Sequence, residues 1–287
     1  MRERLRFVRA RTGAVGLALL VVVAGLALFG PFFAPHAPDA PVGIPLTGPT
    51  VDTPLGTDFL GRDVLSRVLW GGRSVLGLAG LATLLAYVAG AAIGLVAGQA
   101  RSLLDPLLMR SVDVLLSFPA LLFLLVLVTG VSTRTTILGV GTSKAALVIG
   151  VAVVQAPLVA RIVRAATLEQ SVRGFVEAAV ARGERAAAIL RREILPNIAA
   201  PIAADAPLRF TYSIILVASV NFLGLGLQPP AADWALIISE NRSGFVLNPW
   251  VIFVPAALIA LLTIGANMVG DAIARTLGVS TGARGRV

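Results

Sequence analysis

Residues 175–201 read FVEAAVARGERAAAILRREILPNIAAP and form the longest polar, helix-prone stretch in a chain that otherwise alternates between apolar runs and short charged connections. Ala, Leu, Arg and Glu favour a helix throughout this stretch, whereas Gly183 and Pro196 interrupt it. We therefore expect a short helix, a turn at Gly183 and a second, amphipathic helix. Contact with lipid alone does not explain a segment of this composition.

The composition is that of a membrane protein that crosses the bilayer several times. Of the 287 residues, 57% are hydrophobic and 14% are charged, against roughly 25% charged in soluble domains. The net charge is +9, but the basic residues lie in short connections and form no stripe with interleaved aromatics, so we expect no nucleic acid partner. The absence of cysteine excludes disulfides and thiolate metal sites. The single histidine, His36, lies in a Pro-rich loop and is expected to be an ordinary loop residue.

Six windows without charged residues are candidates for spanning helices: residues 12–35, 74–100, 114–133, 145–160, 210–232 and 243–270. A spanning helix needs about 20 residues, and only the fourth window is too short by itself. It reaches that length if Arg161 and Arg164 extend to the cytoplasmic interface. The first window exceeds the roughly 7 to 15 apolar residues of a signal peptide, so we expect an uncleaved span. These windows predict an all-α membrane protein with six transmembrane helices and both termini on one side.

The distribution of basic residues tests this topology, because cytoplasmic connections carry an excess of Lys and Arg. With both termini in the cytoplasm, 17 basic residues fall on that side and six on the outer side, and Arg209 is placed at a helix end. The cytoplasmic set is Arg2, Arg4, Arg6, Arg9, Arg11, Arg101, Arg110, Arg161, Arg164, Arg173, Arg182, Arg185, Arg191, Arg192, Arg275, Arg284 and Arg286. The outer set is Arg62, Arg67, Arg73, Arg134, Lys144 and Arg242. The asymmetry supports an inner-membrane, multi-pass protein with cytoplasmic N- and C-termini.

The connections and prolines add local detail. Residues 63–69 (DVLSRVL) have apolar residues at helical spacing, and we expect them to form a short helix that lies on the outer membrane surface before the second span. Four prolines within or beside the spans are expected to kink or unwind their helices: Pro119, Pro157, Pro207 and Pro255.

No motif gives the chain catalytic or cofactor chemistry of its own. It has no GxxxxGK[ST] phosphate loop, no HExxH and no GxSxG, and the G-x-G at residues 224–226 is followed by two prolines instead of a helix. Asp113 and Asp271 border spans, so we expect no carboxylate pair inside the membrane and no group that couples to an ion gradient. We therefore expect no catalytic, cofactor-binding or metal site, and an energy source in another subunit.

The short helix near residue 175 is the best candidate for contact with that subunit. It carries apolar anchors, small residues and an acid in the first turn, where the helix dipole favours an anion: Phe175, Val176, Ala178, Ala179 and Glu177. Such a helix fits a groove in a partner protein. It also fits anionic lipid, through the arginines that follow it, and composition leaves both interpretations open.

Four segments together resemble one known family. Glu177-Ala178-Ala179, followed by Gly183 and then by Leu195-Pro196, resembles the EAA motif of permease subunits of ATP-binding cassette (ABC) importers. PLGTDFLGRDVLSRVLWGGRSVL at residues 54–76, NFLGLGLQPPAADWA at 221–235 and NPWVIFVP at 248–255 are similar to segments of the oligopeptide, dipeptide and nickel importer family, second-permease type. The resemblance extends to about residue 270, after which the chain lacks the family's later acidic residues.

This resemblance implies a type I ABC importer permease fold. Residues 1–53 would form the N-terminal basic segment, first span and outer loop, and residues 54–287 the transmembrane domain, with the EAA loop at about 173–205. The residues implied to couple to an ATPase are Phe175, Glu177, Ala178, Ala179, Arg182 and Gly183. The implied partners are a paralogous permease, two ABC ATPase subunits that hold ATP and Mg, an extracytoplasmic substrate-binding protein and membrane lipids.

The implied function is to form half of the transmembrane path for peptides or a related small solute, such as a nickel chelate, glutathione or a glycan. Two alternatives belong to other classes. An ion-coupled secondary transporter would need ionisable residues inside the membrane. A non-transporting membrane scaffold would tolerate charge reversal at Glu177.

Overall fold

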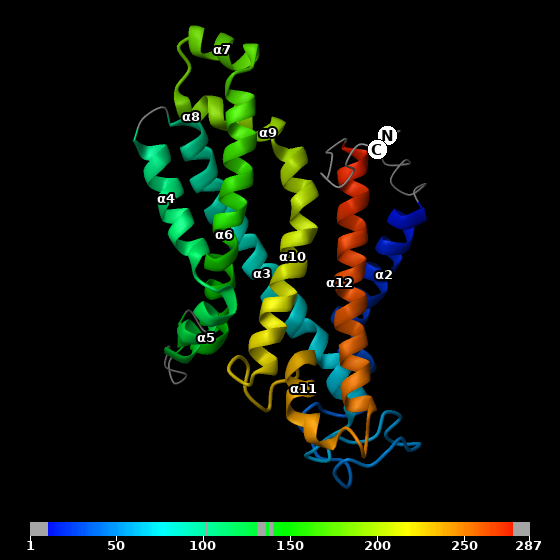
Figure 1. The fold of residues 1–287 in the computed structure, drawn as a ribbon. Coiled ribbons are helices and arrows are strands. Elements are labelled where there is room, and N and C mark those ends of the chain that lie inside the picture. Colours follow the sequence, from blue (N-terminus) through cyan, green and yellow to red (C-terminus); the bar gives the residue numbers. More distant parts are fainter. Residues whose placement is uncertain (1–10, 101–102, 131–135, 138–139, 278–287) are drawn as a thin grey trace, which may run out of the picture.

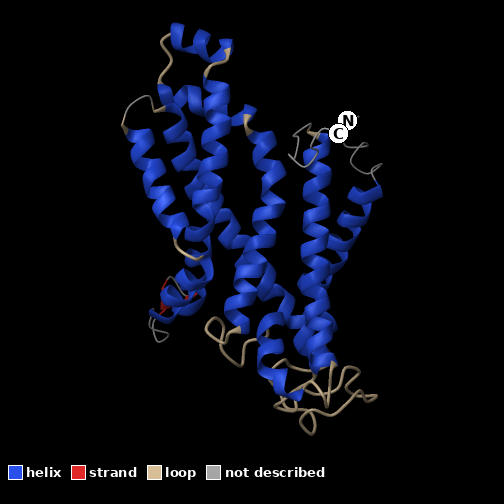
Figure 2. Cartoon of the chain, viewed as in Figure 1, coloured by secondary structure: helices blue, strands red, loops and turns tan. Residues whose placement is uncertain are grey.

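The computed structural model describes residues 11–100, 103–130, 136–137 and 140–277. Nearly all of the ordered structure is helical, and the only strands among these residues are the two-residue β1 (Thr136–Ile137) and β2 (Val140–Gly141), which pair antiparallel (Figure 2). Five helices are long and apolar enough to cross a membrane, and a sixth span is a bent pair of helices. The prediction of an all-α protein with six transmembrane segments is therefore confirmed.

The spans are α2 (Arg11–Phe29), α3 (Val64–Gln99), the pair α4 (Leu104–Ser117) and α5 (Ala120–Gly130), α6 (Thr142–Ser171), α10 (Ala199–Phe222) and α12 (Trp250–Thr276). The shorter helical elements are η1 (Gly30–Phe33), α7 (Gly174–Ala181), α8 (Ala186–Ile189), the π-helical turn η2 (Leu190–Ile194), α9 (Leu195–Asn197), α11 (Trp234–Asn241) and η3 (Arg242–Gly244). Helices α7, α8 and α9 lie at one end of the bundle, together with the start of α2 and the end of α12 (Figure 1). The long loop after η1 and helix α11 lie at the opposite end.

Helix α3 begins ten residues before its predicted window, so the prediction of a separate surface helix at residues 63–69 is wrong. These residues form the first turns of α3, and Val64 and Arg67 are fully buried. The Asp63 carboxylate accepts from the backbone N–H groups of Leu65 and Ser66 and so caps the helix. The charged residues made this helix start look like part of a surface segment, because the burial of Arg67 depends on partners elsewhere in the chain.

Those partners form a buried ion cluster at the end of the bundle that carries the long loop and α11. Arg67 Nη1 lies 2.7 Å from Asp58 Oδ2 and 2.6 Å from Glu240 Oε2. Arg62 bridges the same two carboxylates at 2.7 and 2.8 Å. Because Asp58 is in the loop and Glu240 is in α11, the cluster fixes both to the start of α3. A buried charge is stable only when it is paired and hydrogen-bonded, so this end of the molecule is a rigid cap.

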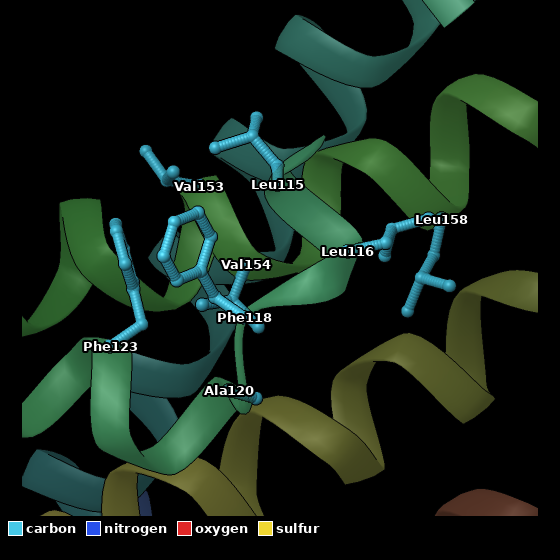
Figure 3. Close-up of a pocket in the computed structure, with 8 residues that line it drawn as sticks. All are labelled: Leu115, Leu116, Phe118, Ala120, Phe123, Val153, Val154 and Leu158. Carbon is cyan, nitrogen blue, oxygen red and sulfur yellow. The ribbon is translucent and has the colours of Figure 1, made fainter. Parts of the chain in front are cut away.

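The predicted break at Pro119 is confirmed, because α4 and α5 meet there at 85°. The break borders an apolar cavity of about 270 Å³ between this bend and α6 (Figure 3). Its lining comprises Leu115, Leu116, Phe118, Ala120, Phe123, Val153, Val154 and Leu158. Helices α6, α10 and α12 continue through Pro157, Pro207 and Pro255, so breaks at those residues do not occur.

Helix α4 begins at Leu104, not at the predicted residue 114. Asp113 pairs with Arg161 at 2.5 Å and Asp105 pairs with Arg164 at 2.5 Å, which joins α4 to α6. Helix α6 extends beyond its predicted window through Arg161 and Arg164, as expected. The two side chains are paired with carboxylates of α4.

The window predicted at residues 210–232 is wrong at both ends, because α10 spans residues 199–222. Arg209 was placed at a helix end, yet it lies in the middle of α10 with Asp205 one turn before it. Arg209 Nε lies 3.2 Å from Asp205 Oδ1, and the Tyr87 hydroxyl donates to Asp205 Oδ2 at 2.6 Å. An Asp–Arg pair therefore lies within this span, which the charge-free windows did not predict.

Helices α3 and α6 pack at very short range through glycines. A Cβ built on Gly94 would lie 2.6 Å from the Ala160 carbonyl oxygen and 2.7 Å from Val163 Cβ, and Gly90 and Gly98 approach α6 as closely. Small residues at this spacing let two helix backbones approach in a membrane. Helices α2 and α12 form a second close pair in which Gly16 faces Met268, and α10 lies between the two pairs (Figure 1).

We predict that Gly94→Ala lowers the stability of the protein by about 1 to 3 kcal/mol, the usual cost of overpacking, because the added methyl meets backbone that cannot move aside. The matched control is Gly77→Ala in the same helix, where nothing lies within 4 Å of the added atom. That control should be neutral or stabilising, since Ala favours a helix over Gly by up to about 1 kcal/mol. Thermal unfolding of the purified variants measures both, and equal effects would contradict the close packing of α3 on α6.

Candidate functional site

The loop between α6 and α10 projects from the end of the bundle and has the predicted order of elements (Figure 1). Helix α7 begins three residues after the end of α6, and the chain then returns through α8, η2 and α9 into α10. The prediction of a short helix, a turn at Gly183 and a second helical segment is therefore confirmed. Both ends of the loop thus continue into spanning helices, with α7 close to the end of α6 and joined to α10 through α8, η2 and α9.

The turn at Gly183 follows from its backbone conformation. Gly183 has φ +75°, which is left-handed and favours glycine. Its N–H donates to the Val180 carbonyl at 2.9 Å, and the Glu184 N–H donates to the Ala179 carbonyl at 3.1 Å. These two bonds form a Schellman motif, which satisfies the last carbonyls of α7 and ends the helix at a fixed angle.

One face of α7 is held against the rest of the protein. Val176 is 6% exposed and Ala179 is fully buried. Both belong to an apolar cluster with buried residues of α6, of α8 and η2, and of the entrance to α10: Val159, Val163, Ile189, Ile194 and Ile198. Ala179 was expected on the surface that meets a partner, but the structure places it on the buried face of α7, where its small side chain permits close packing.

The remaining predicted residues lie on the exposed face of α7 or at its C-terminal end. Phe175 is 37% exposed, and Glu177 and Ala178 are also exposed. Arg182 Nη2 donates to Glu184 Oε1 at 2.6 Å, so its guanidinium already has a partner within the loop. Phe175, Glu177 and Ala178 are thus all accessible on α7, and the turn at Gly183 sets the direction in which the chain leaves the helix.

This site is an accessible helical surface of the kind that fits contact with a partner protein. Within the described residues no group of three His, Asp or Glu side chains is placed to hold a metal ion. The accessible face of α7 offers one aromatic ring, one carboxylate and a methyl group on a short helix with a rigid base. Such a surface transmits force when a second protein seats on it.

Sequence reasoning missed a second polar group of residues, which lies inside the bundle. Gln155 of α6 is 2% exposed and donates through Nε2 to the Arg209 carbonyl at 2.8 Å, and Arg209 Nη1 donates back to Gln155 Oε1 at 3.4 Å. With Tyr87 of α3 and Asp205, these residues tie three spanning helices together. The spacing of Asp205 and Arg209, four residues apart on a helix, was the signal available in the sequence.

Comparison with known proteins agrees with both the fold and the loop. Residues 90–279 match the family described as the binding-protein-dependent transport system inner membrane component, and residues 4–52 match the N-terminal transmembrane domain of oligopeptide transport permease C. The dipeptide transport system permease protein DppC of Alkalihalophilus pseudofirmus is 33% identical, over 90% of this chain and 83% of that protein. The glutathione transport system permease protein GsiD of Pectobacterium atrosepticum is 34% identical, over 93% of this chain and 87% of that protein.

A solved structure shares the fold. An inward-facing structure of the MetNI methionine ABC transporter superposes with a TM-score of 0.60 and 21% identity, over 74% of this chain and 96% of that chain. The family match covers well over half of the present chain, and the sequence relatives cover nearly all of it. The chain belongs to the binding-protein-dependent transport system inner membrane component family, and it is a permease subunit of an ABC importer.

Proposed function

We propose that this chain forms half of a transmembrane path for peptides, and that α7 is the coupling helix that receives movement from an ATPase. The observation that supports this most strongly is the packing of α7, which has an accessible face above a buried one, follows α6 closely and reaches α10 through the packed segments α8, η2 and α9. A flexible loop at this place would absorb a displacement imposed by a partner, whereas a packed helix transmits that displacement to α6 and α10.

The proposed assembly contains this chain, a paralogous permease, two ABC ATPase subunits that bind ATP and Mg, and an extracytoplasmic substrate-binding protein. The end that carries α7 faces the cytoplasm in this proposal, and so do both termini, because the positive-inside rule assigns most of the basic residues to that end. The Arg275 guanidinium donates to the Thr12 hydroxyl at 2.9 Å, which supports the placement of the two ends of the chain on one side.

The proposed cargo is a peptide or a related small solute. Relatives that span most of this chain are named as dipeptide and glutathione permeases, and both of those cargoes contain peptide bonds and free carboxylates. The paired charges inside the bundle, Asp205 with Arg209, meet one requirement of an ion-coupled transporter. Family membership favours the ATP-driven mechanism over that alternative.

We predict that Glu177→Lys abolishes ATP-dependent dipeptide uptake by the reconstituted complex and the stimulation of its ATPase by loaded binding protein. Reversal of the charge on the outer face of α7 alters the surface that meets the ATPase and leaves the buried face intact, so the variant should still insert in the membrane. The matched control is Glu169→Lys, at an exposed carboxylate near the end of α6 (side chain 66% exposed), which should retain uptake. Normal uptake by Glu177→Lys would contradict the coupling role.

We also predict that Gly183→Val reduces uptake several-fold and that Gly183→Asn retains most of it. No atom lies within 4 Å of a Cβ built on Gly183, so the penalty comes from the backbone alone. A left-handed residue with a side chain costs about 1 to 2 kcal/mol, and Asn tolerates this conformation far better than a β-branched residue does. Uptake measured for both variants in parallel tests whether the angle of α7 matters. An equal loss in the two would indicate that the bulk of the side chain is what interferes.

A further inference from the structure

Helix α10 exposes one continuous stripe in the middle of the membrane. The stripe consists of Leu208, Tyr212, Ile215, Ser219 and Phe222, which lie three or four residues apart; Ser219 is partly buried and the other four are exposed. Arg209 lies beside this stripe, 13 residues before the end of α10. At 1.5 Å per residue this is about 20 Å from the outer end of the helix, which is well inside a hydrocarbon core of about 30 Å.

Arg209 has hydrogen-bonding capacity that the protein leaves unused. Its Nε donates to the Asp205 carboxylate and its Nη1 to Gln155. The two N–H groups on Nη2 have no acceptor among the residues that the structure describes. The Arg209 side chain is only 10% exposed. An under-used guanidinium at this depth is costly unless a further acceptor reaches it.

The Tyr212 side chain marks the direction from which an acceptor can arrive. The Arg209 guanidinium carbon lies 5.5 Å from the centroid of the Tyr212 ring, within the range of a cation–π contact. Tyr212 itself is 48% exposed and carries a hydroxyl group on the stripe. The ring therefore forms an accessible aromatic wall next to a positive group.

The composition of helices α2 and α12 indicates by contrast that the stripe on α10 faces the transmembrane path and not lipid. Helix α2 has no ionisable residue after Arg11, and α12 has none between Trp250 and Gly270. Helices that contact lipid have this composition. Ionisable residues in spans almost always face a bundle interior or a water-filled cavity, and α10 places such a group next to its exposed surface.

We propose that Arg209 and Tyr212 form a binding site within the path for a carboxylate of the cargo, which for a peptide is the C-terminal carboxylate. Nη2 of Arg209 donates to the carboxylate, and the Tyr212 ring borders the site. Asp205 orients the guanidinium through its Nε edge, which leaves Nη2 for the ligand. This proposal rests on the proposed function, because it presumes peptide cargo.

Accessibility of the stripe to water is the first test, and it does not depend on the cargo. The chain has no cysteine, so Tyr212→Cys adds its only thiol. In the assembled complex, a charged, membrane-impermeant thiol reagent should modify this residue, and a saturating free-acid dipeptide should slow the reaction. The matched control is Val21→Cys on α2, which is 61% exposed in an apolar span and should stay unmodified. A Tyr212→Cys variant as inert as the control would overturn the proposal even if ATP-dependent uptake is normal.

The second test distinguishes two roles of Arg209, which are binding the cargo carboxylate and holding the spanning helices together. Arg209→Gln should lower uptake of a free-acid dipeptide at least tenfold relative to the unaltered complex, while uptake of its C-terminal amide changes little. Arg209→Lys should restore part of the free-acid rate. Because each cargo is compared with the unaltered complex, any preference of the binding protein cancels. An equal loss for both cargoes would show that Arg209 only holds the helices together. Failure of the unaltered complex to take up either peptide would instead refute the proposed cargo.

Discussion

The burial of Val176 and Ala179 fixes α7 against the rest of the loop, and the proposed coupling role depends on this contact. Small apolar side chains at these two positions let the helix approach the isoleucines of the returning segment closely. Dispersion contacts at such short range resist displacement of one element against another. The Schellman motif at Gly183 then fixes the direction in which the chain leaves the helix. In the proposed coupling role, a force applied to the accessible face of α7 is carried into α6 and α10, which are the two spans that the loop connects.

Those two helices also carry most of the polar network inside the bundle. Gln155 belongs to α6, whereas Asp205 and Arg209 belong to α10, and Tyr87 adds α3 to the same network. Helices α3 and α6 are locked together by glycine packing, so a shift of α10 relative to this pair alters the surroundings of Arg209. The proposed coupling surface of α7 and the proposed carboxylate site are thus connected through two helices. The buried ion cluster holds the loop and α11 to the start of α3 at the opposite end of the bundle.

Much of this arrangement was predictable from local sequence, and the errors arise where distant partners decide the structure. The turn at Gly183 and the break at Pro119 follow from the backbone preferences of single residues, so both were predicted correctly. The starts of α3, α4 and α10 were wrong because a charged residue was taken as the end of a span, and the end of α10 was wrong because the uncharged loop after Phe222 was counted as helix. Asp113 pairs with Arg161, 48 positions away, and one sequence does not reveal such a partner. Burial of Ala179 likewise depends on residues of the returning segment.

We propose that the exposed face of α7 contacts an ATPase and that its buried face does not. Because the chain has no cysteine, this can be measured by cross-linking from two adjacent positions, Ala178→Cys on the exposed face and Ala179→Cys on the buried face. A short bifunctional thiol reagent is applied to the complex, and the linked chains are identified by mass spectrometry. We expect a cross-link between Ala178→Cys and the ATPase subunit and none from Ala179→Cys. Cross-linking from Ala179→Cys alone, or from neither position, would contradict the coupling role of α7.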